Sequence, residues 1–337
     1  MNYNNVGIIM TNKCNAACEI CCFGCNPSNK DVIDESFMIE CIKQISEIPE
    51  IITVAFSGGE PFLFPDLLLK GVQLAKQHNL HTTVITNGFW GKEYGEDGFE
   101  EIAKYLSELE LDKMYISTDD YHNKYVSLNV AQNAITLSRA VVKSTQVMVG
   151  ETKNSLQAHE VIYKMDDRKY LMNFSIYPFL RIGKANELPD NEFYRHYPKK
   201  GLFCGYDKIA AIRYDGEVFP CCNQFVFDSV LTLGNIKNTP LKEILKKTKQ
   251  NALLSILRTK GFDWFVDVAE NELEIKLCET YSSACELCHT LFANRSMLDK
   301  FVPFVEREYN NMLVNSLLNR RANDEDNKFG SVTDRQM

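Results

Sequence analysis

Short apolar runs and amphipathic stretches alternate along the first half of the chain. Between the runs, apolar residues recur at helical spacing, for example at Met38, Ile42 and Ile45. An alternation of strands and helices predicts a parallel sheet covered by helices, which is an α/β fold. Six runs have the length and composition of buried strands, namely Val6–Met10, Ile51–Phe56, Thr82–Thr86, Met114–Ser117, Gln146–Val149 and Phe174–Phe179.

The pattern changes near residue 185. The segment Asn186–Gly201 is polar and contains prolines, which is typical of a linker. Further on, Lys208–Tyr214 and Glu217–Phe219 flank Asp215 and Gly216, a turn signal that predicts a hairpin.

The C-terminal part has a helical pattern from residue 302 to about residue 319. Arg320–Met337 is charged and polar without apolar periodicity, which predicts a frayed tail. We therefore expect a first domain over residues 1–185, a linker over 186–203, a second domain over 204–300, and a helix with a polar tail over 301–337.

Composition narrows the class of protein. The chain has 337 residues, of which 45% are hydrophobic, and a net charge of −8 with a pI near 5.4. This acidic balance argues against a nucleic-acid partner or an anionic membrane, since both require a basic face. No signal peptide or membrane-spanning apolar run is apparent, and the twelve cysteines cluster in metal-ligand spacings. We expect a cytoplasmic protein with neither nucleic acid nor membrane as a partner.

The chemistry begins directly after the first predicted strand. Cys14, Cys18 and Cys21 have the spacing C-x3-C-x2-C. Three thiolates on one loop can hold three irons of a 4Fe–4S cluster and leave the fourth iron open to another ligand. A structural zinc or a set of buried thiols is the alternative, although zinc sites more often use two C-x2-C pairs.

This motif resembles the signature of the radical S-adenosylmethionine (SAM) superfamily, and a second motif agrees with it. Gly58, Gly59 and Glu60 precede Pro61 at the end of the second strand, as in the segment that binds the amino group of SAM in that family. The resemblance implies a partial (β/α)6 TIM-like barrel with its chemistry at the carboxyl ends of the strands. It also implies SAM contacts at three positions further on, Asn87, Ser117 and Asp119. The alternative for these last residues is a turn or a helix cap.

Four cysteines of the second half form another set, Cys204, Cys221, Cys285 and Cys288. The predicted hairpin would bring Cys204 near Cys221. Their order resembles the SPASM/twitch extension of radical SAM enzymes, which implies one auxiliary 4Fe–4S cluster with these four ligands. Two 4Fe–4S clusters are therefore expected in all. A zinc ribbon is the alternative.

Several stretches together are similar to the YydG-type radical SAM peptidyl epimerases. These enzymes convert L- to D-residues in ribosomally made peptides. In that family's chemistry SAM yields a radical that takes the Cα hydrogen, and a thiol returns hydrogen from the opposite face. The resemblance implies that Cys222 is the thiol donor and that Asp207 orients the peptide or relays a proton. The stretches are Cys18–Cys25, Asn87–Gly91, Asp119–His122, Gly205–Asp207, Asp215–Cys222, Gly261–Phe265 and Ser282–Cys288.

The expected partners are a precursor peptide and a cytoplasmic electron donor, flavodoxin or ferredoxin. Thioether or C–C crosslinking of a precursor peptide is the alternative function, and an iron–sulfur redox sensor or electron carrier is a more distant one. Cys22 and Cys25 are surplus to the first cluster and are expected to be packing thiols. His122 has no ligand spacing but is expected near the mouth of the barrel.

Overall fold

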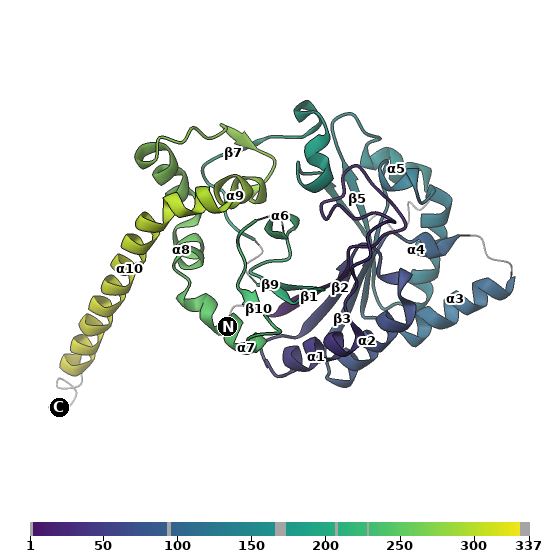
Figure 1. Ribbon diagram of the computed structural model, residues 1–337, viewed down its shortest axis with the longest axis horizontal. Helices are drawn as coiled ribbons and strands as arrows, with labels where there is room; N and C mark the ends of the chain where they lie inside the picture. The colour runs from purple at the N-terminus through teal and green to yellow at the C-terminus, as the bar shows by residue number, and fades with distance from the viewer. Residues whose placement is uncertain (1–2, 93–95, 166–172, 206–207, 228, 331–337) are drawn as a thin grey trace.

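A curved sheet forms the body of the computed structural model, which describes residues 3–92, 96–165, 173–205, 208–227 and 229–330 (Figure 1). Within these residues the strand order is β10-β9-β8-β1-β2-β3-β4-β5-β6. The first six strands follow one another in space as they do in the chain, and neighbours pair in parallel. They are β1 (Asn5–Thr11), β2 (Thr53–Gly58), β3 (His81–Thr86), β4 (Lys113–Ser117), β5 (Thr145–Glu151) and β6 (Phe174–Pro178).

Helices connect these strands and cover the convex face of the sheet (Figure 1). The six strands predicted from the sequence are all present, and so is the α/β class. A polar side chain caps some of the helices, as at α1, where the Asp34 carboxylate accepts hydrogen bonds from the backbone N–H groups of Ser36 and Phe37. The helices are α1 (Glu35–Ser46), α2 (Pro65–Gln77), α3 (Glu96–Glu108), α4 (Leu128–Val141) and α5 (Ala158–Lys164).

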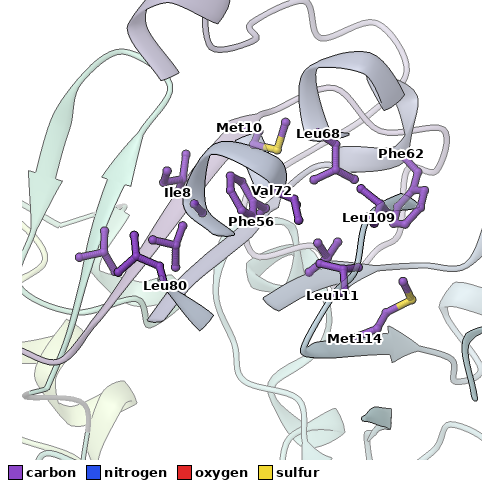
Figure 2. Close-up of a cluster of buried hydrophobic side chains, with 14 of the residues drawn as sticks. Ile8, Met10, Phe56, Phe62, Leu68, Val72, Leu80, Leu109, Leu111 and Met114 are labelled. Atoms are coloured by element: carbon purple, nitrogen blue, oxygen red, sulfur yellow. The ribbon is translucent and has the colours of Figure 1, made fainter. Parts of the chain in front are cut away.

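The main core lies between the sheet and these helices (Figure 2). Ile8, Phe56 and Met114 of the strands and Leu68 and Val72 of α2 all have no exposed surface, and Val72 lies next to Phe56 (Figure 2). Burying a side chain of this size contributes about 1.5–3 kcal/mol. Because alternate residues of a strand point to opposite faces, the neighbours of these residues face the hollow of the barrel.

A hairpin from the second half of the chain extends the same sheet. Strand β8 (Ile209–Arg213) pairs in parallel with β1, and β9 (Glu217–Phe219) pairs antiparallel with β8. The short strand β10 (Gly234–Asn235) completes this edge. The sequence predicted the hairpin but not its place beside β1, where Gly7 lies opposite Ala211. The second domain is therefore joined to the barrel through the sheet itself.

The remaining helices lie on the same side of the molecule as the hairpin, and all but the last are grouped around it (Figure 1). The residues expected to form a linker are partly ordered, because β7 (Tyr197–Pro198) pairs with β11 (Thr280–Tyr281). Helix α10 continues to Gly330, well beyond the predicted end near residue 319, and projects away from the body (Figure 1). No helix within the described residues is both long and apolar enough to cross a bilayer. The helices are α6 (Gln224–Phe227), α7 (Leu241–Lys247), α8 (Ala252–Asp267), α9 (Ala284–Phe292) and α10 (Arg295–Gly330).

Candidate active site

A cavity of about 170 Å³ opens at the carboxyl ends of the barrel strands. Its wall combines the loop after β1, the ends of β2 to β4, and aromatic residues of β6 and the segment after it. Among the residues expected at a cofactor site, the wall includes Cys14, Cys18, Cys21, Gly58, Gly59, Asn87 and Ser117. Residues that lie far apart in the sequence thus meet at one edge of the sheet, as parallel strands require.

The cysteine loop is held from several sides. The backbone N–H of Cys14 donates to the Asn26 carbonyl at 3.2 Å, and that of Lys184 donates to the Cys21 carbonyl at 3.0 Å. Gly183 approaches so closely that a Cβ there would lie 2.4 Å from the Cys22 carbonyl oxygen. The loop is therefore fixed by contacts that do not depend on its thiols.

Donors surround the thiols themselves. The backbone N–H of Ala16 lies 3.4 Å from the Cys14 sulfur, and that of Cys25 lies 3.3 Å from the Cys21 sulfur. Hydrogen bonds from the Cys22 and Cys25 thiols hold the pKa of Cys21 well below its usual value. Burial raises the pKa of Cys14 and of Cys18 to about 12 each, so these two thiols lose their protons only to a bound cation. The loop fits a group that coordinates thiolates.

Gly58 and Gly59 allow the end of β2 to approach the cysteine loop closely. The backbone N–H of Gly59 donates to the Thr11 carbonyl at 2.7 Å. A Cβ on Gly59 would lie 2.0 Å from the Lys13 carbonyl oxygen, and a Cβ on Gly58 would lie 2.3 Å from that of Thr11. No larger residue fits at either position without moving the loop that carries Cys14.

Glu60 lies behind the wall of the cavity and has no exposed surface. Its carboxylate accepts hydrogen bonds from the Thr86 hydroxyl at 2.8 Å, the Asn87 backbone at 2.8 Å and the Phe62 backbone at 3.1 Å. Burial raises the pKa of Glu60 to about 7. The structure thus places this carboxylate as a brace between β2 and β3, with its oxygens turned toward the protein.

Asn87 connects that brace to the cysteine loop. Its side-chain amide donates to the Asn15 side chain at 2.9 Å and lies 3.7 Å from the Cys14 sulfur. Its side-chain oxygen accepts from the backbone N–H of Phe89 at 3.0 Å. Asn87 therefore lines the cavity in a fixed orientation.

Asp119 also lies behind the wall, and His122 takes its place at the surface of the cavity. The Asp119 carboxylate accepts from the ring Nδ1 of His122 at 2.7 Å and from the backbone N–H groups of Tyr121 and His122 at 3.0 Å each. Although burial lowers it, the pKa of His122 is raised overall by this carboxylate. Asp119 thus engages Nδ1 of the His122 ring, and the other ring nitrogen, Nε2, is not bonded to Asp119.

The second set of cysteines surrounds a separate cavity of about 60 Å³. Cys204, Cys221, Cys285 and Cys288 all line it, although Cys204 precedes β8 and the last two lie on α9. Burial raises the pKa of Cys285 to about 12 and those of Cys221 and Cys288 well above their usual values. The rest of the described wall is largely apolar. The structure brings together the four cysteines that the sequence grouped.

Four cysteines in one cavity can bind either a zinc ion or an iron–sulfur cluster. A tetrahedral zinc with bonds of about 2.3 Å would draw its sulfurs to about 3.8 Å from one another. Among the described residues, no three His, Cys, Asp or Glu side chains are grouped closely enough to hold one ion.

The neighbours Cys221 and Cys222 have different surroundings. Cys221 lines the second cavity, whereas Cys222 is absent from the described wall of either cavity. A Cβ built on Gly7 would lie 3.9 Å from the Cβ of Cys222, which places Cys222 against the inner face of β1. Burial raises the pKa of Cys222 to about 11, so its sulfur carries hydrogen at neutral pH.

Aromatic residues link the cysteine loop to the hairpin. The ring of Phe23, in the wall of the first cavity, lies 5.1 Å from that of Phe227 on α6. Phe227 in turn lies 4.8 Å from Phe219 of β9, and Cys222 packs in the same apolar group. The contact between Phe23 and Phe227 joins the cysteine loop to the apolar group that contains both Cys221 and Cys222.

Other expected residues have mixed outcomes. Asp207 lies outside the described residues. Cys22 and Cys25, expected to be packing thiols, both line the first cavity, and Cys25 is buried. Sequence reasoning missed Tyr177 and Phe179, which line that cavity and pack edge to face at 5.5 Å. Their place at the end of the sixth predicted strand was the available signal.

Family models match two parts of the chain. The model described as the radical SAM superfamily matches residues 8–146, and an iron–sulfur cluster-binding domain model, SPASM, matches residues 204–289. The first match contains the C-x3-C-x2-C loop and the glycine pair, and the second contains the four later cysteines.

Individual relatives agree with these matches. The chain is 28% identical to a peptide biosynthesis protein of Bacillus subtilis (strain 168), YydG, over 91% of this chain and 98% of the relative. It is 22% identical to the tungsten-containing aldehyde ferredoxin oxidoreductase cofactor-modifying protein of Pyrococcus furiosus, over 78% of this chain and 83% of the relative. A solved structure of anSMEcpe with bound AdoMet has a TM-score of 0.56 at 17% identity and covers 91% of this chain and 99% of that one. That structure has the same fold.

Proposed function

Because the chain contains a radical SAM domain followed by an iron–sulfur cluster-binding SPASM domain, we propose that it is a peptidyl epimerase. It converts L-residues of a ribosomally made precursor peptide into D-residues. The two domains imply SAM and two 4Fe–4S clusters as cofactors. Similarity over nearly the full length to a peptide biosynthesis protein supports a peptide as the substrate.

Some residues of the first cavity would touch the cofactors, and others hold those residues in position. Cys14, Cys18 and Cys21 would hold the first cluster, with Gly58, Gly59, Asn87 and Ser117 around SAM. We assign Glu60 and Asp119 to positioning, because both carboxylates are buried and turned toward protein donors. When bound, the cluster and SAM supply the removal of a hydrogen atom from an unactivated C–H bond.

The observation that carries the epimerase proposal is the divergence of Cys221 and Cys222. Cys221 shares the second cavity with Cys204, Cys285 and Cys288, which fits a cluster ligand. Cys222 lines neither cavity in the described residues and faces Gly7 on the inner side of the barrel sheet, although both cysteines pack in the apolar group of Phe219. A protonated thiol that no cluster needs, placed inside the barrel, is suited to give a hydrogen atom to a substrate radical.

SAM would be cleaved with one electron from a flavodoxin- or ferredoxin-type donor, and its deoxyadenosyl group would leave as deoxyadenosine carrying the Cα hydrogen of the peptide. A planar carbon radical then remains in the peptide. The S–H bond of Cys222 breaks and a C–H bond forms on the opposite face, which inverts the centre and leaves a sulfur radical. A second electron from the donor and one proton restore the thiol. We assign Asp207 to orienting the peptide or relaying that proton, in keeping with its place in the Gly205–Asp207 stretch.

We further propose that the peptide lies across the mouth of the barrel and that the enzyme works in the cytoplasm. A reducing compartment would keep the twelve cysteines available to clusters. The net charge of −8 gives no reason to expect nucleic acid as a partner.

Turnover in deuterated water tests the proposal. Thiol exchange makes the donor S–D, so each inversion should place one non-exchangeable deuterium at the inverted Cα and raise the product mass by about one unit. Crosslinking would instead remove two hydrogens from the peptide. A product of that lower mass, with no D-residue, would exclude the epimerase.

Variants of the two neighbouring cysteines sharpen the test. Cys222→Ala and Cys222→Ser should keep both clusters and still form deoxyadenosine, but yield no D-residue, since a hydroxyl O–H bond is too strong to replace the thiol. Cys221→Ala should lose iron as well as activity. Cys278→Ala, at an exposed thiol, serves as the control. If Cys222→Ala still makes deuterated D-residue, another group donates the hydrogen.

A further inference from the structure

One cation lies in the wall of the second cavity. Arg258 of α8 lines it together with the four cysteines and the apolar side chains of Leu254, Leu257 and Phe262. Among the described residues of this wall, Arg258 is the one that carries a permanent charge. Helix α8, which carries Arg258, contributes no cysteine to the cavity.

Tyr3, near the N-terminus, holds the Arg258 side chain in place. Nη2 of Arg258 donates to the hydroxyl of Tyr3 at 3.2 Å, and the guanidinium lies 5.7 Å from the centre of the Tyr3 ring. The Tyr3 hydroxyl donates in turn to the Pro220 carbonyl, also at 3.2 Å. Pro220 directly precedes Cys221, and Tyr3 is buried. The positive charge therefore has a fixed position beside the segment that carries a cysteine ligand.

Such a charge has a predictable effect on a cluster. Four thiolates close a 4Fe–4S centre with net negative charge, and one-electron reduction makes it more negative still. A fixed cation in a poorly solvated wall stabilises the more negative, reduced state, because screening is weak there. Net charge and hydrogen bonding around a cluster are known determinants of its potential.

We propose that Arg258, held by Tyr3, raises the reduction potential of the auxiliary cluster. The consequence is functional: the cluster becomes easier to reduce by an external donor of modest reducing power. Arg258 is a positioning and tuning residue here, since it acts on the cofactor rather than on the peptide.

The potential of the auxiliary cluster tests this directly. We would place each substitution in a chain that lacks the first cluster through Cys14→Ala, Cys18→Ala and Cys21→Ala, so that one cluster remains. Iron content and a spectroelectrochemical titration followed by electron paramagnetic resonance are then measured. Arg258→Gln should keep about four irons and shift the balance toward the oxidised cluster at least tenfold, which is about 59 mV more negative for a one-electron couple.

Matched variants separate charge from structure. Arg258→Lys should restore most of the potential. Tyr3→Phe should lower it by less than Arg258→Gln does, because the guanidinium loses its anchor but stays in the wall. Lys260→Gln, on the same helix and paired with Glu308, should leave it unchanged. If Arg258→Gln loses its iron, the test uses the other two variants. A lower potential in Tyr3→Phe, with a nearly wild-type potential in Arg258→Lys, then supports the proposal. Unchanged potentials in every variant that retains iron would overturn the proposal.

Discussion

Replacing Glu60 with glutamine probes the brace between β2 and β3. All three partners of this carboxylate are donors, and the Thr86 hydroxyl is itself the acceptor for the Gly88 backbone at 3.0 Å and the Trp90 indole at 3.2 Å. A glutamine oxygen can satisfy Thr86 and Phe62. Its amide group then faces the Asn87 N–H, which leaves buried donors without acceptors at a cost of about 1–3 kcal/mol each.

The burial of Glu60 has the opposite effect on stability, because it favours the neutral glutamine over an ionised carboxylate. The pKa of Glu60 is about 7 in the folded chain against 4.5 ordinarily, so at pH 8, where this group is ionised in both states, the shift makes the folded state about 3 kcal/mol less stable than an unshifted carboxylate would. Glutamine does not pay this cost. At pH 8 we therefore expect Glu60→Gln to lower the free energy of unfolding by only about 1–2 kcal/mol, as the two effects nearly offset.

The sign of the pH dependence follows from linkage. Between pH 4.5 and about 7 the unfolded chain releases the Glu60 proton while the folded chain keeps it, so the stability of the wild type falls as pH rises. The glutamine variant lacks this dependence. The difference between the two proteins should therefore grow by about 3 kcal/mol as pH is lowered from 8 to 4.5.

Urea denaturation of the metal-free chain measures this difference. Trp90 reports on the right region, because its indole donates to Thr86 and its ring lies 5.2 Å from Phe62. Glu40→Gln, on the exposed part of α1, is the control. A difference that stays constant with pH, or shrinks as pH falls, would refute the reasoning, since Glu60 would then ionise normally in the folded state.

Two further predictions concern the first cavity. Replacing Cys14, Cys18 and Cys21 together with alanine should halve the iron content of the reconstituted protein and abolish SAM cleavage; zinc as the tightly bound metal would contradict the cluster assignment. His122→Asn, which keeps a donor toward Asp119 but lacks a group at Nε2, should leave iron content unchanged and weaken SAM binding about 3–10-fold, the loss of one hydrogen bond. Asp119→Asn should add little to that variant, because Asp119 acts through His122; additive losses in equilibrium SAM binding would show that Asp119 has a separate role.

Local patterns in the sequence determined the scaffold. Strand runs such as Val6–Met10 and the helical spacing of Met38, Ile42 and Ile45 are short-range signals, and each corresponds to an element of the structure. The first cysteine motif is local too, because its three cysteines lie within eight residues of chain. Such features are readable because period and spacing are set by neighbours in sequence.

The tertiary structure decided where the side chains point. The sequence predicts cofactor contacts for Glu60 and Asp119, and the folded chain buries both carboxylates against protein donors, while Asn87 and His122 line the cavity. The differing surroundings of Cys221 and Cys222 depend on β8 pairing with β1, a contact between distant segments. Tyr3 reaches Pro220 across 217 positions of sequence, and no motif marks it. A local pattern specifies which element forms, whereas the direction of a polar side chain is set by donors and charges that only the folded chain brings within hydrogen-bonding distance.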